Sequence, residues 1–482
     1  MGGKNAVLVT QNAELDETVS GILYSAFGHA GQKCSACSRV IVHNSLKNKL
    51  IERLREAASD LKVGSAFDFE TSVNPIISVE DKERLKRQAK EAAAEAHKYN
   101  GQVVVDRSDF DSKGNSVGPV IIELPYDRAF DKDSFAVREL FGPVIHIIGF
   151  DALDDGIKLF NSTEYALTGG VFSQSQNDID YILTKIECGN VYVNRTITGA
   201  RVAIEPFGGF KLSGTGPKAG GKHYLIALHQ TKELGESLQT LPVEEGTAFQ
   251  FDLMRPSKLN VLSRADRMNK FLDTLVSAYE SYYQGITPGH KETLKEMNKW
   301  LAKYFVSFVS KEHKNRIIPG QLSYNDYRLF AEHGIVVATT DRPNIKTLIQ
   351  VFSGLSIGTG MTILCRNEKS YQFWMRIRDA ILNAGFSKEN FDVFFTNSKN
   401  LSTALNHPKL SVIIFDGPMS EYKNQIANFF DDGKLDLRMK LILTPADFVK
   451  TSDFYHQLMH FVWVRAMAVN TMRHGAPLDL DI

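Results

Sequence analysis

The chain has 482 residues, and its 56 basic side chains balance its 56 acidic ones, so the formal net charge is zero. This balance gives no indication of a nucleic-acid partner or an anionic surface. Apolar residues make up 43% of the chain, which is typical of a globular protein that can bury substantial cores. No apolar run approaches the ~18–20 residues of a membrane span, no signal-peptide pattern opens the chain, and four cysteines make no disulfide framework. We therefore expect a cytoplasmic protein of about three domains without an integral membrane segment.

The first half of the chain alternates between strand and helix patterns. Strands are predicted at 6–9, 103–105, 120–123, 144–148, 169–173 and 190–194. Helices are predicted at 16–30, 46–61, 80–99, 151–162 and 177–187. This alternation favours an α/β domain.

Beyond residue 250 the pattern changes to two long helices followed by a second alternation. Helices are predicted at 263–283, 290–312, 344–354, 368–384, 398–405 and 420–430. Strands are predicted at 335–339, 362–365, 392–395, 411–415 and 440–444. The order predicts a second α/β unit with a doubly wound parallel sheet. The polar, weakly patterned stretch 236–249 is typical of a linker.

Two glycine-rich stretches resemble phosphate-binding loops but lack the required spacing. The run 205–221 does not contain G-x-x-x-x-G-K-[ST], so we interpret it as a structural turn, followed by a helix and an edge strand up to about residue 235. Gly358-Thr359-Gly360 is not a full G-x-G-x-x-G directly after a strand. Neither stretch predicts a dinucleotide site.

Cys34 stands between a predicted helix and the apolar run 40–42, a junction that suits a nucleophile. The thiolate is the reactive form of cysteine, and Lys33 and Arg39 could supply part of the positive field that favours it. Cys34 also forms C-x-x-C with Cys37, which leaves several interpretations open. They are half of a zinc site, a thioredoxin-like redox pair, a nucleophile beside a structural cysteine, and a plain buried thiol. The zinc interpretation lacks an obvious second pair of ligands.

Four further motifs follow Gly31-Gln32-Lys33-Cys34 in order, at 138–144, 161–172, 193–200 and 206–214. Each is weak alone, but the five in this order over 1–235 resemble the catalytic half of the aldehyde dehydrogenase superfamily. The stretch 210–221 and the surroundings of Cys34 and Gly199 resemble the glutamate semialdehyde (pyrroline-5-carboxylate) dehydrogenase branch. That branch occurs as a separate enzyme and as a module of the bifunctional proline utilization protein.

The resemblance implies roles for seven residues. Cys34 matches the nucleophile, which forms a thiohemiacetal and then a thioester as hydride leaves to NAD. Glu139 matches the carboxylate that binds the nicotinamide ribose, and Phe141 matches the aromatic residue beside the nicotinamide. The residues implied at the substrate are Ser35, Gly199, Ala200 and Phe207. Without the resemblance, Glu139 would be taken for a solvated surface acid and 199–200 for an ordinary turn.

The resemblance also implies that part of the family pattern is missing. In the family, the water-activating Glu is followed by one residue and then by a Gly-Gly turn. Here the turn is Gly2-Gly3, so Met1 occupies the position between the expected Glu and the turn. We therefore expect an N-terminally truncated enzyme that lacks its general base and most of its NAD-binding domain, and that is inactive alone. The expected domains are an NAD-binding remnant at 1–30, the catalytic domain at 31–235, a linker at 236–262 and a degenerate aldehyde-dehydrogenase-like domain at 263–482.

The function that the resemblance implies is NAD-dependent oxidation of L-glutamate 5-semialdehyde to L-glutamate in proline degradation. Two alternatives stay open. One is a non-catalytic assembly piece that complements a separate N-terminal half, and the other is a dehydrogenase for a different aldehyde. The expected partners are a small aldehyde substrate and either further copies of the chain or an upstream N-terminal half. Neither nucleic acid nor a metal ion is expected.

Overall fold

The chain folds into two compact units. The first consists of Met1–Leu228, His313–Asp326 and Val464–Ile482, and the second of His229–Glu312 and Tyr327–Trp463. The units therefore interleave along the chain, whereas the domains expected from the sequence are contiguous. The computed structural model describes residues 2–110, 114–202, 204–214, 218–221, 224, 242, 244–248, 252–278, 281, 288–309, 318, 320–329, 331–341, 343, 345–417, 441–443, 454–473 and 476–477.

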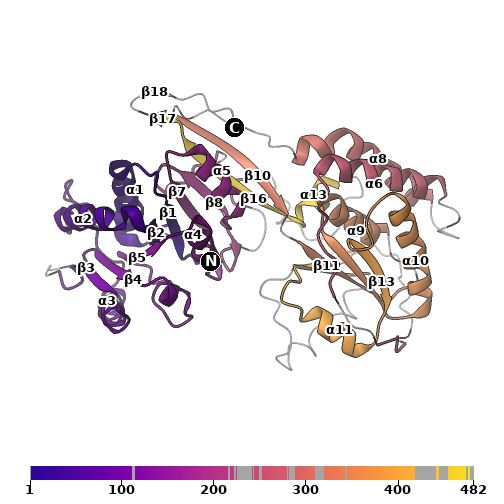
Figure 1. The fold of residues 1–482 in the computed structure, drawn as a ribbon, viewed down its shortest axis with the longest axis horizontal. Coiled ribbons are helices and arrows are strands. Elements are labelled where there is room, and N and C mark those ends of the chain that lie inside the picture. The colour runs from indigo at the N-terminus through magenta and orange to yellow at the C-terminus, as the bar shows by residue number, and fades with distance from the viewer. Residues whose placement is uncertain are drawn as a thin grey trace. The chain divides into compact units, whose positions relative to one another are not determined.

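The first unit is built on a nine-stranded sheet in the order β10-β16-β8-β7-β1-β2-β5-β4-β3 (Figure 1). Its strands are β1 Asn5–Val9, β2 Cys37–His43, β3 Gln102–Asp106, β4 Val120–Leu124, β5 Val144–Phe150, β7 Thr168–Phe172, β8 Asn190–Val193, β10 Gln321–Leu329 and β16 Val462–Asn470. The five residues of β1 are all buried, and β1 pairs in parallel with both β2 and β7. The strand that opens the chain therefore lies in the interior of the sheet.

Two short strand pairs complete the β structure of this unit. β6 Tyr165–Ala166 pairs antiparallel with β9 Phe210–Lys211, which belongs to the glycine-rich run. β17 Met472–Arg473 pairs in the same way with β18 Ala476–Pro477. The first pair fixes part of the run that the sequence analysis interprets as a structural turn.

Helices cover both faces of the first sheet. They are α1 Leu15–Phe27, α2 Asn44–Asp60, α3 Val79–Lys98, α4 Leu153–Phe160 and α5 Gln176–Lys185, with short 3-10 turns η1 Gly28–Gly31 and η2 Asp127–Phe130. Successive residues of a strand point to opposite faces. In β7, Gly169 lies against Phe160 of α4, whereas Gly170 lies against Ile197, whose backbone N–H bonds Ser25 of α1. Helices α1 and α4 therefore pack on opposite faces.

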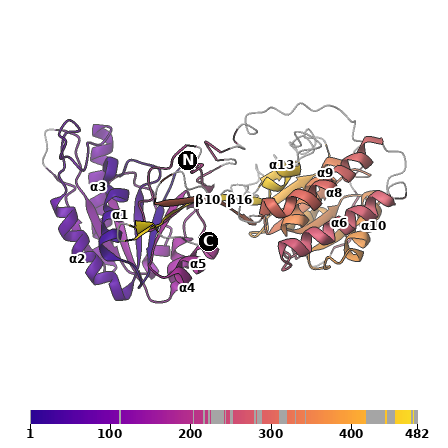
Figure 2. The same cartoon turned by 90° about the horizontal axis from the view of Figure 1, so that it is seen from above.

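The second unit contains a five-stranded parallel sheet in the order β13-β12-β11-β14-β15. Its strands are β11 His333–Ala338, β12 Gly360–Cys365, β13 Phe391–Phe395, β14 Val412–Phe415 and β15 Leu441–Leu443. Its helices are α6 Val261–Ser277, α8 Pro288–Val309, α9 Ile345–Ile357, α10 Glu368–Asn383, α11 Ser398–Leu405 and α13 Phe454–Met459. Helices α6, α8 and α10 lie together in two perpendicular views (Figures 1 and 2). This strand order is the doubly wound arrangement that the sequence predicts.

A buried polar cluster joins β11 to β14, the strands at which the order of the second sheet reverses. Asp416 follows β14 and is fully buried. Its carboxylate accepts hydrogen bonds from the backbone N–H groups and hydroxyls of Thr339 and Thr340, which follow β11, at 2.8–3.4 Å. In doubly wound folds this crevice is where ligands bind. Here the Asp416 carboxylate occupies the hydrogen-bond donors of Thr339 and Thr340 at this crevice.

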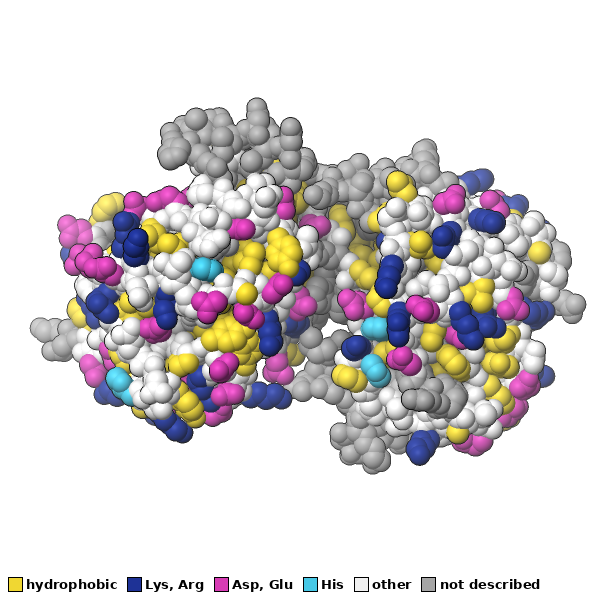
Figure 3. All heavy atoms as spheres, in the orientation of Figure 1, with side chains coloured by type: hydrophobic (Ala, Val, Ile, Leu, Met, Phe, Trp, Pro, Cys, Tyr) yellow, Lys and Arg dark blue, Asp and Glu magenta, His cyan; other side chains and the backbone are white. Residues whose placement is uncertain are grey.

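The α/β class of both units is confirmed, and most predicted elements match within a few residues. Strands β10 and β16 were not predicted. The predicted helix at 420–430 and most of the segment 222–241 lie outside the described residues. None of the helices in the described part of the chain combines the length and apolar character of a membrane span. On the visible face of each unit, basic and acidic side chains are interspersed (Figure 3).

Candidate active site

Cys34 follows a tight turn that the end of α1 creates. The helix begins at a Glu14 cap, which accepts the backbone N–H groups of Asp16 and Glu17, and it stops at Gly28. His29, Ala30 and Gly31 then all adopt left-handed backbone conformations, with φ of 57°, 53° and 68°. Such conformations cost about 1–3 kcal/mol for residues other than glycine and concentrate at functional sites.

The thiol of Cys34 is the accessible one among the four cysteines. All four are free; Cys34 is half-buried, whereas Cys37, Cys188 and Cys365 are buried. Burial raises the pKa of Cys37 to about 12, and its thiol donates to the Arg39 carbonyl at 3.4 Å. Within the described residues no group of three or more metal-ligand side chains is found. The C-x-x-C pair therefore contains one half-buried thiol and one buried, protonated thiol.

Asn5, at the start of β1, holds the turn that carries Cys34. Its amide nitrogen donates to the carbonyls of Cys34 and Ala36 at 2.8 and 2.9 Å. Its amide oxygen accepts the backbone N–H of Thr168 at 3.0 Å. One buried side chain thus joins three segments, and the sequence analysis assigned it no role. The only local signal was its position, an asparagine at the first residue of an apolar strand.

The backbone of Gly2 and Gly3 passes between the Cys34 turn and Glu139. Gly3 donates its N–H to Glu139 Oε1 at 3.0 Å. A Cβ on Gly3 would lie 2.7 Å from the Cys34 carbonyl oxygen, and a Cβ on Gly2 would collide with Glu139 Oε2. Because the atom that a Gly3 side chain would meet belongs to the backbone, the approach at Gly3 requires glycine. The structure therefore brings the predicted nucleophile and the predicted ribose-binding carboxylate to the same pair of residues.

Tyr165 and Ser213 also contact the Gly2-Gly3 segment, both at Gly2. The Tyr165 ring lies beside Gly2, and burial together with the Glu139 carboxylate raises the pKa of its hydroxyl. Ser213 donates to the Gly2 carbonyl at 2.7 Å and accepts the Ala166 N–H at 3.1 Å. The glycine-rich run thus contributes Ser213, which the sequence analysis did not single out.

Phe141 lies in a loop packed between the Cys34 turn and α3. Its backbone is left-handed, with φ of 56°, and its side chain is 43% exposed. A Cβ on Gly31 would collide with the Gly142 carbonyl, and a Cβ on Gly142 would collide with Leu85 of α3. Two glycines therefore permit close packing that presents an aromatic ring to the surface beside Glu139.

The predicted substrate residues lie on three segments. Ser35 is buried, and its carbonyl accepts the Thr168 hydroxyl at 3.2 Å. Gly199 is exposed with φ of 85°, and a Cβ added to it would meet no atom within 4 Å; Ala200 is half-buried. Phe207 is half-buried and exchanges two 2.9 Å backbone hydrogen bonds with Ala219.

The loop after β8 is tied to the helix that leads into the Cys34 turn. The backbone N–H of Ile197 donates to the Ser25 hydroxyl of α1 at 3.0 Å. Further along, Glu205 accepts the Arg201 N–H at 3.1 Å and pairs with Arg195 at 3.3 Å. Among the residues that the structure describes, no hydrogen bond joins Gly199, Ala200 or Phe207 directly to Cys34.

The Cys34 turn, the Gly2-Gly3 segment and Glu139 come together within the first half of the chain. Residues 1–234, just under half of the chain, match the Aldehyde dehydrogenase family. The resemblance recognised in the sequence is thereby confirmed.

The curated relatives that this half matches include two bacterial 1-pyrroline-5-carboxylate dehydrogenases. The one from Staphylococcus haemolyticus is 35% identical over 236 residues, and the one from Bacillus subtilis is 36% identical over 237 residues. Each match covers 49% of this chain and 44% of the relative. The chain therefore spans less than half the length of the curated relatives it matches.

One solved structure is similar over nearly the whole chain. It is proline utilization A from Corynebacterium freiburgense, with a TM-score of 0.59 and 22% identity. The match covers 98% of this chain and 39% of that one. At this identity the likeness concerns the fold, and it extends through both units.

Proposed function

We propose that the first unit carries the nucleophile of an NAD-dependent dehydrogenase that oxidises L-glutamate 5-semialdehyde to L-glutamate in proline degradation. The observation that carries the proposal is the Gly2-Gly3 segment, which holds Glu139 and the Cys34 turn side by side. The substrate follows from the names of the relatives at 35–36% identity, which are 1-pyrroline-5-carboxylate dehydrogenases.

In the proposed reaction, the Cys34 thiolate attacks the aldehyde carbon and forms a thiohemiacetal. The new oxyanion accepts a hydrogen bond from the Cys34 backbone N–H. Oxidation of the thiohemiacetal to a thioester needs a hydride acceptor, which NAD held at Glu139 and Phe141 would supply. Water then hydrolyses the thioester to the carboxylate and restores the Cys34 thiol. Asn5 positions this cysteine, because it holds the carbonyls on either side of Ser35.

The residues at Glu139 and Phe141 fit the nicotinamide-ribose end of NAD. Glu139 uses one carboxylate oxygen for the Gly3 N–H, and its Oε2 accepts no hydrogen bond within the described part of the chain. A carboxylate oxygen of this kind suits a ribose hydroxyl, and the exposed Phe141 ring suits an aromatic cofactor face. We propose that the rest of the dinucleotide site comes from segments that the matched relatives have outside the matched region.

The loop at Gly199 and Ala200 suits the carboxylate end of the substrate. Gly199 is exposed, and its positive φ turns the backbone so that successive N–H groups can face an anion. We propose that this loop and the Ser35 hydroxyl bind the α-carboxylate, and that Phe207 packs on the aliphatic part of the substrate.

Thiol labelling tests the role of Cys34 without requiring turnover. Iodoacetamide at pH 8 should label Cys34 alone in the folded chain, because the other three thiols are buried and the pKa of Cys37 is raised to about 12. Four labels are expected in denaturant. Mass spectrometry locates the sites, and Cys37→Ser serves as the matched control that keeps the Cys34 label. Labelling of Cys37 before Cys34 would contradict the proposal.

Activity is tested with the chain supplied alone and mixed with the portion of the B. subtilis relative that lies outside the match. We expect NADH formation from L-glutamate 5-semialdehyde only in the mixture, and its loss in Cys34→Ser. Propionaldehyde, which lacks the α-carboxylate, should react at least tenfold more slowly. Equal rates with both aldehydes would favour a different substrate, whereas co-purification without NADH formation would favour the non-catalytic assembly piece.

A further inference from the structure

A small, partly open polar cavity lies beside the first residues of β1. Its polar walls come from Lys4, Asn5, Arg39, Thr168 and Glu187, and its volume is about 10 Å³. This is about the space that one water-sized sphere occupies. The space that a water-sized sphere can reach therefore suits a single water molecule or a small ion.

Two buried cationic side chains line this cavity. Lys4 is 2% exposed and Arg39 is 1% exposed. The terminal nitrogens of Arg39 donate to the carbonyls of Leu159 and Phe160 at 3.0 Å. In contrast, Nζ of Lys4 and Nε of Arg39 have no hydrogen-bond partner among the residues that the structure describes.

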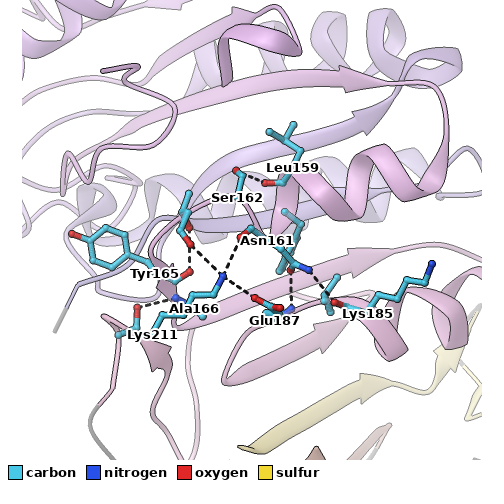
Figure 4. A network of polar contacts seen from close by, with 12 residues as sticks. Leu159, Asn161, Ser162, Tyr165, Ala166, Lys185, Glu187 and Lys211 are labelled. Carbon is cyan, nitrogen blue, oxygen red and sulfur yellow. Dashed lines mark hydrogen bonds and ion pairs between the residues drawn. The ribbon is translucent and has the colours of Figure 1, made fainter. Parts of the chain in front are cut away.

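The acidic groups near the cavity form no ion pair with Lys4 or Arg39 within the described residues. Glu187 lines it, but its carboxylate pairs with Lys211 at 2.7 Å (Figure 4). Lys211 is fixed there by the carbonyls of Asn161 and Thr163. Glu139 accepts the Gly3 N–H, and no ion pair between Glu139 and Lys4 occurs within the described ranges. Positive charge therefore exceeds negative charge at the cavity, and burying an unpaired charge is unfavourable.

We propose that this cavity binds a monatomic anion of the halide class, chloride in the cell, between the Lys4 ammonium and the Arg39 guanidinium. The small volume favours a monatomic ion over phosphate, sulfate or a carboxylate. The bound ion would give both unpartnered nitrogens a charge-assisted acceptor. Since Lys4 lies between Gly3 and Asn5, the ion would also stabilise the segment that holds Glu139 and the Cys34 turn. This inference does not depend on the proposed function.

The charge state of Lys4 makes the binding depend on pH. Burial, with a smaller effect from Arg39, lowers the pKa of Lys4 to about 7. A bound anion favours the charged amine, so binding should strengthen as the pH falls below 7. Burial also holds the pKa of His146 well below its usual range, so this neighbour adds no charge there. The other ionisable groups around Lys4 and the cavity are Cys37, Arg39, Glu95, Glu139, Tyr165, Glu187 and Cys188.

Thermal unfolding of the full chain tests the site. At pH 6.5 and constant ionic strength, exchanging gluconate for chloride or bromide should raise the Tm of the first unit by about 2–4 °C. Sulfate should not give this rise. Lys4→Met should abolish the halide effect, because it keeps the length of the side chain but removes the amine. Lys49→Met, the same change at an exposed position of α2, should retain it.

Bromide anomalous scattering locates the ion independently. Crystals soaked in bromide at pH 6.5 should show a peak between Lys4 Nζ and Arg39 Nε. A water molecule at that position without bromide, or a halide-dependent Tm that persists in Lys4→Met, would overturn the proposal. If Lys4→Met does not fold, the bromide map of the unaltered chain decides. Neither measurement uses turnover, so failure here leaves the proposed function untouched.

Discussion

Asn5 is the side chain on which the geometry of the Cys34 turn depends most directly. It uses both amide hydrogens and its oxygen on backbone groups of two other segments, all within 3.0 Å. Each of these backbone groups would otherwise need another partner in a buried environment. Asn5 therefore acts on Cys34 through the backbone and not through the thiol.

Asn5→Ala should lower the free energy of unfolding by about 2–4 kcal/mol, because it leaves two buried carbonyls and one buried N–H without partners. Urea titration measures this change. Asn12→Ala is the matched control; the Asn12 amide bonds Asp178 at the surface, and its loss should stay within about 0.5 kcal/mol. Equal effects of the two substitutions would show that Asn5 does not support the turn.

Lys4 should make the stability of the first unit depend on pH. Its pKa is lowered to about 7 in the folded chain from an ordinary 10.5, so between these values the unfolded chain binds a proton that the folded chain does not. Stability must then rise with pH across this window, with a slope of up to about 1.4 kcal/mol per pH unit.

Urea titrations from pH 6.5 to 10 in halide-free buffer measure this slope. Lys4→Met should remove it. Burial also lowers the pKa of Lys218 to about 7. Lys218 therefore adds the same slope to the unaltered chain and to Lys4→Met, and the difference between the two slopes isolates the effect of Lys4. Identical slopes would mean that Lys4 is charged and solvated in the folded chain.

At the residue scale, the sequence predicts candidate reactive and binding residues better than the residues that hold them in place. Cys34, Glu139 and Phe141 could be proposed as site residues because each belongs to a short motif, and the structure brings Glu139 and the Cys34 turn together. Asn5 and Ser213 act through hydrogen bonds to residues far along the chain, such as Thr168 and Gly2. Local patterns contain no information on such partners.

At the scale of elements, the close approach of two glycines sets the position of the Cys34 turn. Gly31 ends the 3-10 turn with a left-handed φ of 68°, and its α-carbon lies against the carbonyl of Gly142 in the Phe141 loop. The turn and the loop therefore pack backbone to backbone. A side chain on Gly31 would have to push the two segments apart.

Gly31→Ala should destabilise the first unit by about 2–4 kcal/mol, since it adds both a left-handed alanine and a collision with the Gly142 carbonyl. It should also change the rate at which iodoacetamide labels Cys34. Gly28→Ala is the control in the same turn, because its φ is −55° and a Cβ there meets nothing within 4 Å. Urea titration compares the two, and a stable Gly31→Ala chain would refute the packing argument.

Elements with their own periodicity were predictable, and elements defined by distant partners were not. The helix 398–405 and the strand 190–194 match α11 and β8 closely because helical and alternating patterns are local. β10 and β16 were missed. β16 is a short apolar run, which periodicity alone cannot distinguish from a buried helix. Its pairing with β8, from the other end of the chain, was beyond any local signal.

At the scale of the whole molecule, the first unit depends on residues from both ends of the chain. β16 pairs with β8 through Ala466–Val469, and Arg465 of the same strand is 1% exposed. Its guanidinium donates to the carbonyls of Leu183 and Ile186 at 2.8 and 3.1 Å and pairs with Asp326. One buried cation thus joins β16, β10 and the end of α5.

Arg465→Met should lower the stability of the first unit by about 2–4 kcal/mol, because it removes the hydrogen bonds that Arg465 donates to Asp326 and two carbonyls. Differential scanning calorimetry measures the effect. The control is Arg53→Met, which removes an exposed ion pair with Asp16 and should cost at most about 1 kcal/mol. An equally small effect at Arg465 would mean that β16 is held by its backbone pairing alone.

The position of β16 has a consequence for how the chain is made. A ribosome releases β8 long before β16, and the whole second unit is synthesised between them. Until β16 arrives, β8 presents an unpaired strand edge, which is the kind of surface on which nascent chains misassociate. The unit that leaves the ribosome first is therefore the last to complete its fold, and chaperone demand should concentrate on that interval.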